Sequence, residues 1–428
     1  VDFTTGKLES LQRRLDLRAG MFTAEATWTS PAGKRLRLVQ RRITDLVDTA
    51  RVFVQYEIEP MNFTGRVEMT AGVRADTRTL DQPVYEPRKV EAAGERGVAV
   101  RIEGNRDHRT AAFATTVQVA DQPGVEYRRQ LDPPSPTVSA TFAVTEGKVT
   151  YVERAGVVAD DRREDRPLAA ATEAVAEAES VPFERARTDH AAAWQQLWDD
   201  SDVRIDGPLD DQLAARFSVF QLLINASRDD AGVSIPAKGI TGEGYRGMVF
   251  WDTDIHMTPF FIFTQPGRAR NLMTFRHRTL DGARAKAERY GYRGAMYPWE
   301  TGYSGEEETE KWLRLITHQV HITADVVYAM MQYVETTRDM AFYEDGAAEA
   351  LIETARFWVS KAEDRGGHVS IPGAGGPDEY HVAEDDSAYV NNLAIRNLRW
   401  AVAAADHLKA NASEKWEALG RRIGVTDD

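Results

Sequence analysis

The sequence predicts a multidomain β + α protein, with an antiparallel β-sandwich at the N-terminus and packed helices after it. The first observation is length: 428 residues, 42% hydrophobic and 28% charged, are enough for two or more cores. The second is hydrophobic periodicity, which is mostly 2 from about residue 36 to residue 158 and helical from Leu168 onward. The third is the charged stretch 160–167, which has nothing to bury and separates the two patterns.

Four runs carry the strand pattern. Apolar and polar side chains alternate in them, as expected for strands with one buried face. The runs are Arg51–Glu59, Ala112–Ala120, Thr137–Val144 and Lys148–Glu153. Because Gly, Pro and Asp punctuate them, they are predicted to pair as antiparallel strands of a sandwich.

Eight segments after the charged stretch have a helical period. They are Leu168–Ala178, Glu184–Trp198, Leu209–Arg228, Arg268–Tyr290, His318–Thr336, Met340–Ser360, Ser387–Asn411 and Glu414–Arg422. The broad apolar stripe of Ala324–Val334 suits packing against other helices in layers. Between the helices, the segments Ile235–Phe250 and Arg293–Thr309 are rich in Gly, Pro, aromatic and acidic residues. Long loops of this kind on a helical scaffold are where a site is expected.

Charge and composition exclude several classes of function. With 53 Lys and Arg against 67 Asp and Glu, the net charge of −14 has the wrong sign for binding nucleic acid or anionic lipid. The chain has no cysteine, which rules out disulfides, thiolate nucleophiles and sulfur-ligated metals and favours a cytoplasmic location. No apolar run reaches the roughly 20 residues of a membrane-spanning helix, and Val1–Gly20 lacks the apolar region of a signal peptide.

Four segments concentrate chemically useful side chains: Gly242–Asp254, Gly294–Gly302, Gln319–Asp325 and Gly376–His381. In the first, Trp251 lies beside Asp252. A tryptophan next to a carboxylate suits a sugar, which offers an apolar ring face for stacking and hydroxyl groups for charged acceptors. Cleaving a glycosidic bond also needs a carboxylic acid that stays protonated near neutral pH, and a partly desolvated acid among other acids fits that task.

Four motifs, in this order and spacing, resemble those of glycoside hydrolase family 65. They are Gly242–Asp254, Tyr297-Pro-Trp-Glu300, His321-Ile-Thr-Ala-Asp325 and Gly376-Pro-Asp-Glu-Tyr-His381. This family holds inverting phosphorylases of maltose, trehalose, kojibiose and nigerose, and some hydrolases. The resemblance covers essentially the whole chain. It implies a β-sandwich over residues 1–160, a helical linker over 161–207 and an (α/α)6 barrel over 208–428, followed in the family by a small β domain.

The resemblance also implies roles for six residues. Glu379, in the last motif, would be the general acid. Arg246, Trp251 and Asp252 would line the subsite of the transferred glucosyl unit, and the loop with Trp299 and Glu300 would shape the subsite of the acceptor sugar. No cofactor is implied, since inorganic phosphate enters a phosphorylase as a co-substrate. A disaccharide or small α-glucoside is the expected substrate, and a homodimer is the suggested assembly.

The chain departs from the family in length and in one position. Family members are several hundred residues longer, so this chain is expected to begin inside the sandwich, at a residue other than methionine, and to stop near mid-barrel at Asp428. The family's Lys-Gln pair, its phosphate-binding residues and the base of a hydrolase would then lie in a missing C-terminal segment or a second chain. Met248 stands where many relatives have histidine.

Each motif also has a plainer interpretation. Trp251 could be a core aromatic, and Glu379 with its neighbouring aspartate could cap the helix that follows. The acids of Glu306–Glu310 fit a solvated loop better than a metal site, because they lack converging geometry. His321 and Asp325 have an i, i+4 spacing that suits zinc, but no further His or Cys completes a ligand set.

Three functions therefore stay open. In an inverting phosphorylase, Glu379 protonates the leaving oxygen and phosphate attacks from the opposite face, so one protein carboxylate suffices. An inverting hydrolase needs a second carboxylate, roughly 6.5–9.5 Å from the first. The third alternative is a non-catalytic half-barrel that binds sugar or a complementary polypeptide.

A phosphate site is not visible in the sequence. Basic or Gly-rich clusters suited to a dianion are missing, and the helical half is acidic. The chain by itself is therefore predicted to bind phosphate no better than millimolar and to show no phosphorolysis.

Overall fold

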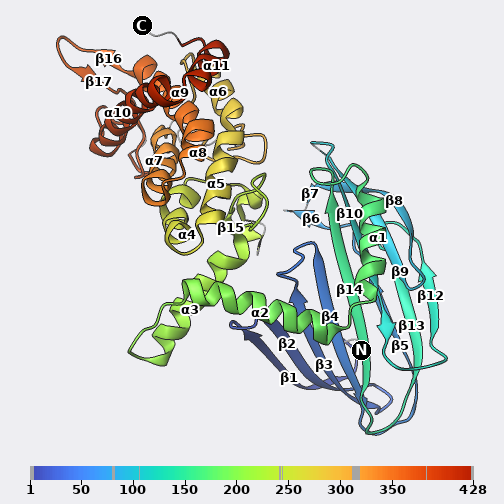
Figure 1. Ribbon diagram of the computed structural model, residues 1–428. Coiled ribbons are helices and arrows are strands. Elements are labelled where there is room, and N and C mark those ends of the chain that lie inside the picture. Colours follow the sequence, from blue (N-terminus) through green and yellow to red (C-terminus); the bar gives the residue numbers. More distant parts are fainter. Residues whose placement is uncertain are drawn as a thin grey trace. The chain divides into compact units, whose positions relative to one another are not determined.

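The computed structural model describes residues 4–79, 82–105, 107–240, 242, 244–310, 319–381 and 383–425. The chain divides into two compact units, Val1–Asp202 and Val203–Asp428. The first holds the large sheets and the second holds most of the helices (Figure 1).

Two antiparallel sheets form the N-terminal unit. The larger follows the order β1-β2-β3-β4-β14-β10-β9-β8, with β11 pairing with β14, and the smaller follows β12-β13-β5. The bounds in the larger sheet are β1 Lys7–Asp16, β2 Met21–Thr29, β3 Arg35–Thr44, β4 Arg51–Pro60, β8 Tyr85–Ala93, β9 Gly97–Gly104, β10 Thr110–Thr116, β11 Gln118–Val119 and β14 Thr150–Asp160. Those in the smaller are β5 Gly65–Gly72, β12 Glu126–Gln130 and β13 Thr137–Val144, and a short hairpin joins β6 Arg78–Thr79 to β7 Gln82–Pro83.

Alternating side chains pack the two sheets against each other. Along β13, Val138, Ala140 and Phe142 are buried, whereas the residues between them are more exposed. They share one apolar cluster with Val98 and Val152 of the larger sheet. The two-residue period of the sequence therefore produces the predicted sandwich.

Two helices complete the N-terminal unit. Helix α1 (Pro167–Glu179) packs Val175 into one cluster with Phe53 of the larger sheet. Helix α2 (Phe183–Ser201) is anchored by His190, whose Nδ1 accepts the Leu46 amide hydrogen at 3.1 Å while Nε2 lies 3.2 Å from the Gly20 carbonyl. Burial lowers the pKa of His190, and a neutral ring suits one accepted and one donated bond.

The predicted strands lie where the sequence placed them, but some of their boundaries differ. The predicted strand Ala112–Ala120 is wrong as one strand, because the pairing is interrupted at Val117 between β10 and β11. Strand β14 runs to Asp160 rather than 153, since β10 and β4 pair along both of its edges. The charged stretch forms the turn between β14 and α1. The division into three segments at 160 and 207 stays a prediction.

The C-terminal unit is built mainly of helices. They are α3 Leu209–Asn225, α4 Thr258–Thr264, α5 Pro266–Arg278, α6 Leu280–Arg289, α7 His321–Thr337, α8 Met340–Phe342, α9 Ala348–Lys361, α10 Ala388–Asn411 and α11 Ser413–Ile423. The short strands are β15 Ala237–Ile240, β16 Glu363–Asp364 and β17 Val369–Ser370. No helix of the described ranges is long and apolar enough to cross a membrane.

Three helix predictions need correction. The segment Arg268–Tyr290 is two helices, because Thr279 leaves the helical conformation and its Oγ1 donates back to the Phe275 carbonyl. Helix α4 was not predicted, since the run Phe260–Phe263 is too uniformly apolar to show a period. A π-helical turn interrupts the segment predicted as one helix from Met340. His318, the predicted first residue of α7, lies outside the described residues.

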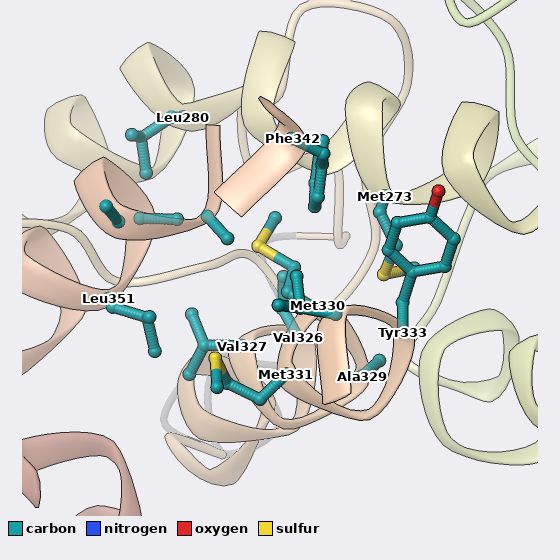
Figure 2. Close-up of a cluster of buried hydrophobic side chains, with 14 of the residues drawn as sticks. Met273, Leu280, Val326, Val327, Ala329, Met330, Met331, Tyr333, Phe342 and Leu351 are labelled. Atoms are coloured by element: carbon teal, nitrogen blue, oxygen red, sulfur yellow. The ribbon is translucent and has the colours of Figure 1, made fainter. Parts of the chain in front are cut away.

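Helix α7 is buried on nearly all sides and organises the core of this unit. Figure 2 shows Val326 and Met330 of α7 with Met273 of α5, Phe342 of α8 and Leu351 of α9. A helix without a polar face is stable only when other helices surround it. The core therefore fixes the start of α7, where the His321 motif lies.

Glu349 of α9 ties four helices together through charged side chains. Its carboxylate accepts bonds from His277 of α5 at 3.1 Å, Arg284 of α6 at 2.6 Å and Arg422 of α11 at 2.5 Å. Burial would raise the pKa of Glu349, but hydrogen bonds from His277 and Arg284 and the nearby positive charges lower it to about 2. The ionised carboxylate is therefore a large contributor to stability.

We expect Glu349→Gln to lower the free energy of unfolding by about 3 kcal/mol at neutral pH, from the difference between an ordinary pKa of 4.5 and about 2. Because the folded pKa lies below the unfolded one, this contribution is complete above about pH 5 and disappears as the pH falls toward 2. Urea unfolding at pH 7, 5, 4 and 3 measures it. The control is Glu417→Gln, which removes an exposed pair with Arg421. Equal, pH-independent losses in the two variants would contradict the prediction.

Candidate functional site

Backbone contacts join the motif segments in two pairs. Val249 and Thr301 exchange amide-to-carbonyl bonds of 2.9 and 3.0 Å, which joins the first motif to the second. Gln319 forms a parallel bridge to Gly375, which joins the third motif to the residues before the fourth. The second motif loop also lies directly on α6: a Cβ on Gly282 would be 2.1 Å from the carbonyl carbon of Gly305. Glycine at 282 is therefore required for this loop to pack there.

Arg246 lies on a strained segment and is neutralised by acids. Tyr245 and Arg246 both have positive φ, 58° and 52°. The guanidinium donates to Glu300 at 2.5 Å through Nη2 and to Glu310 at 2.9 Å through Nη1. Burial raises the pKa of Glu300, and Arg246 opposes that shift. Arg246 and Glu300, assigned by resemblance to different subsites, are thus in direct contact.

Glu307 is the acid of this loop that sequence reasoning misjudged. Its side chain is 6% exposed, whereas Glu306 and Glu310 are exposed as a solvated loop predicts. It pairs with Lys286 of α6 at 2.6 Å and accepts the amide hydrogen of Trp299. Burial would raise the pKa of Glu307, but Lys286 and these hydrogen bonds lower it. The pair holds the Trp299 backbone, and no local pattern predicts it because the partners are 21 positions apart (307 − 286).

Trp299 itself packs in an aromatic cluster. Its ring stands edge-on to Phe250 with centroids 4.7 Å apart, and Phe250 contacts Tyr245 in the same way at 5.0 Å. Trp299 is buried, and its Nε1 has no hydrogen-bond partner among the described residues. An indole N–H of this kind is available to an acceptor only after a small rearrangement.

Trp251 lies between two histidine rings. Its centroid is 4.8 Å from His321, with the ring planes at 86°, and 5.0 Å from His256. A π-helical turn, Thr253–Met257, follows it, and such turns are frequent at functional sites. Trp251 is half-buried and packs against the core cluster of this unit, so the interpretation as a core aromatic stays open.

Asp252 is half-buried, and its carboxylate has no hydrogen bond or ion pair within the part of the chain that the structure describes. An acid in this position, beside a fixed indole, is available for the hydroxyl groups of a ligand. The role of Trp251 and Asp252 in binding a glucosyl unit stays a prediction.

A buried ion pair holds the backbone of the segment that contains Trp251. Arg276 of α5 makes bonds of 3.0 and 2.5 Å to the Asp254 carboxylate, and both side chains are at most 1% exposed. The same guanidinium donates to the Phe250 carbonyl at 2.9 Å. The pair therefore fixes the backbone on both sides of Trp251, and nothing in the local sequence singles out Arg276.

The third motif forms a buried hydrogen-bonded chain. His321 Nδ1 lies 2.5 Å from Asp325 Oδ2, one turn further along α7. The other oxygen, Oδ1, accepts the hydroxyl of Tyr389 from α10 at 2.8 Å. His321 Nε2 is buried without a hydrogen-bond partner in the described ranges. The i, i+4 spacing, considered in the sequence only as a zinc pattern, forms a hydrogen bond here, and nothing local in the sequence indicates Tyr389.

Glu379 lies on an exposed loop, which corrects one expectation. The loop is closed at its base by the Ala374 amide donating to the Glu384 carbonyl at 2.8 Å. At its tip Tyr380 is 96% exposed, and Glu379 is exposed as well. The desolvation expected for a general acid is therefore not supplied by residues of the described ranges. Asp378 accepts the Tyr380 amide hydrogen and lies 2.7 Å from His381 rather than capping α10. No hydrogen bond or ion pair of the described ranges links Glu379 to Trp251.

The absence of a cofactor stays a prediction. Within the described ranges, no group of three or more His, Asp and Glu side chains is arranged to hold a metal ion. His321 and Asp325 bond to each other instead of facing a common centre. The i, i+4 spacing of this pair is thus used for a hydrogen bond, and the absence of a metal stays a prediction.

Comparison with known families matches both units. A family model described as "Glycosyl hydrolase family 65, N-terminal domain" matches residues 1–197. A second, described as "Glycosyl hydrolase family 65 central catalytic domain", matches residues 216–426. Together these matches cover nearly the whole chain.

Curated relatives share about a third of the residues. A kojibiose phosphorylase of Halothermothrix orenii is 32% identical over 99% of this chain and 58% of its own length. An alpha,alpha-trehalose phosphorylase of Thermoanaerobacter brockii is 30% identical over 100% of this chain and 57% of its own length. The 1,2-alpha-glucosylglycerol phosphorylase of Bacillus selenitireducens is 29% identical, with 98% and 56% covered. The chain thus spans just over half the length of these relatives.

A solved structure has the same fold. A candidate kojibiose phosphorylase from human microbiome superposes with a TM-score of 0.91, at 22% identity, over all of this chain and 56% of that chain. This confirms the predicted fold class: an N-terminal antiparallel β-sandwich, a helical linker and part of an (α/α)6 barrel.

Proposed function

Because the chain belongs to glycosyl hydrolase family 65, we propose that the protein is an inverting α-glucoside phosphorylase with Glu379 as its general acid. The observation that carries the sugar-binding part is the unpartnered carboxylate of Asp252 beside the fixed indole of Trp251. The choice of phosphate over water as nucleophile is supported by the names of the relatives above, all of which are phosphorylases.

The reaction needs one proton, which Glu379 supplies, and one nucleophile, which is phosphate bound in the site. Glu379 transfers its proton to the glycosidic oxygen while the C1–O bond breaks, and a phosphate oxygen forms a new bond to C1 from the opposite face. The products are a free acceptor, which keeps the proton, and β-glucose 1-phosphate. The carboxylate of Glu379 regains its proton from solvent. Trp251 and Asp252 would hold the glucosyl unit, and Trp299 with Glu300 the acceptor.

Phosphate must be held by groups other than the cations described at the site. Arg246 is paired with Glu300 and Glu310, Arg276 with Asp254 and Lys286 with Glu307. A dianion would compete with these carboxylates in an acidic field. We infer that the part of the protein beyond this chain, which the relatives' length suggests, supplies the phosphate site.

The same further part would cover two exposed features. Along α3, Leu209, Leu213 and Phe217 form one stripe at i, i+4, i+8, and Leu209 is 79% exposed. An apolar stripe of this kind normally faces another helix. The remaining helices of an (α/α)6 barrel would bury it and would desolvate the Glu379 loop. A second copy of the chain is the other candidate to cover the stripe.

Assays of the natural full-length protein test the proposal. Kojibiose, trehalose, nigerose and maltose are incubated with and without phosphate, and products are followed by NMR. We expect turnover of at least one disaccharide only with phosphate, giving β-glucose 1-phosphate. Turnover without phosphate would indicate the hydrolase instead. Binding without turnover would indicate a sugar-binding protein.

We expect Asp252→Ala to lower kcat/KM for the preferred disaccharide about 10–150-fold. The loss reflects about 1.5–3 kcal/mol, because hydroxyl groups of the buried ligand lose a charged acceptor. Steady-state kinetics measure it, and Trp251→Phe should also weaken binding. The control is Glu306→Ala, an exposed acid of the neighbouring loop, with less than a twofold effect expected. If Asp252→Ala folds normally and changes neither kcat nor KM, Asp252 is a packing residue.

A further inference from the structure

One of the two rings that contact Trp251 does not itself face the solvent. This ring is His321, which is fully buried and perpendicular to the indole at 4.8 Å. An edge-to-face contact of this kind fixes the relative orientation of two rings more strongly than nonspecific packing does. The position of the imidazole therefore decides where the indole face points.

Two further residues fix the imidazole. The Asp325 carboxylate, which is fully buried, accepts from Nδ1 at 2.5 Å and so sets both the tautomer and the ring rotation. Tyr389 donates to the other oxygen at 2.8 Å and prevents the carboxylate from turning away. Burial raises the pKa of Tyr389, so its hydroxyl remains a donor.

His321 Nε2, which has no hydrogen-bond partner among the described residues, supports a specific role over simple packing. A buried apolar side chain would fill the same space without leaving a polar atom unsatisfied, and such atoms are rare in folded proteins. Placing a polar ring here makes sense when its fixed edge against Trp251 matters more than the lost hydrogen bond.

We propose that Tyr389, Asp325 and His321 form a positioning chain that orients Trp251 for the glucosyl unit of the substrate. This inference rests on the proposed function for its kinetic consequence, but not for its structural one. None of the three acts on the reacting atoms. Because a stacking platform contacts substrate and transition state alike, loosening it raises KM more than it lowers kcat.

The chain offers a matched pair of tyrosines for the test. Tyr389→Phe removes a phenol that donates to Asp325 at the start of α7, and Tyr333→Phe removes one that donates to Asp339 near its end, both at 2.8 Å. The natural full-length protein is used, labelled with 5-fluorotryptophan. The Trp251 signal is assigned by its loss in Trp251→Phe. Asp325→Asn serves as a second variant on the same chain of contacts.

We expect the ¹⁹F signal of Trp251 to shift or broaden in Tyr389→Phe and Asp325→Asn, and to stay unchanged in Tyr333→Phe. The KM for the disaccharide should rise about 3–10-fold in Tyr389→Phe, with kcat within about twofold, since a single hydrogen bond is lost. An unchanged Trp251 signal in Tyr389→Phe, or an equal shift in Tyr333→Phe, would overturn the proposal. The signal needs no substrate, so a protein that turns over no glucoside would refute the proposed function separately.

Discussion

Replacing Glu379 with Gln is expected to lower kcat/KM of the full-length enzyme at least about a thousandfold on its natural disaccharide. The amide keeps the shape of the side chain and removes the proton that the leaving oxygen needs. General acid catalysis supplies roughly 10²–10⁴ in rate, and a sugar hydroxyl is a poor leaving group that depends on it fully. Steady-state rates of phosphorolysis measure the loss.

Two comparisons make the Glu379 result specific. In an aryl α-glucoside, an acidic phenol can leave as the phenolate without being protonated. Glu379→Gln should therefore lower the rate far less on that substrate. Glu384→Gln changes an exposed acid at the base of the same loop and should retain most of the activity. The assignment fails if Glu379→Gln keeps more than about a tenth of its rate on the disaccharide.

The fold followed from patterns that are local in sequence. The alternation in Thr137–Val144 determines which face of that strand is buried, and the apolar stripe of Ala324–Val334 predicts packing against other helices; both segments lie as predicted. The break at Thr279 did not follow, because no local pattern marks it; Gly305, 26 positions away (305 − 279), lies against the Thr279 carbonyl. Local pattern thus predicts elements, whereas long-range contacts decide where they end.

The candidate site likewise combines features that the local sequence shows with features that depend on distant contacts. The Trp251 and Asp252 pair could be found because the two groups are adjacent in sequence. The i, i+4 spacing of His321 and Asp325 was visible too, but their hydrogen bond was not predicted. Arg276 could not be found, since its partner Asp254 comes from a different element. The exposure of Glu379 was also unpredictable, because it depends on what surrounds the loop.

A second large effect is expected at that buried ion pair. Asp254→Asn keeps the size of the side chain but leaves Arg276 charged, 1% exposed and without its counter-ion. Breaking a buried pair from one side costs about 3–5 kcal/mol, because the remaining charge loses its compensation. Urea unfolding of the full-length protein at neutral pH should show this loss.

The matched control for Asp254→Asn is Asp281→Asn, which removes an aspartate 2.7 Å from Arg284 on the surface of α6. Asp281 is 91% exposed, so this change should cost less than about 1 kcal/mol. Since Arg276 also holds the Phe250 carbonyl, Asp254→Asn should weaken disaccharide binding through the Trp251 segment even where the protein remains folded. Equal stability losses in the two variants would show that Arg276 reaches water. If the Asp254→Asn protein is destabilised but binds the disaccharide normally, the Asp254–Arg276 pair stabilises the fold and has no part in binding.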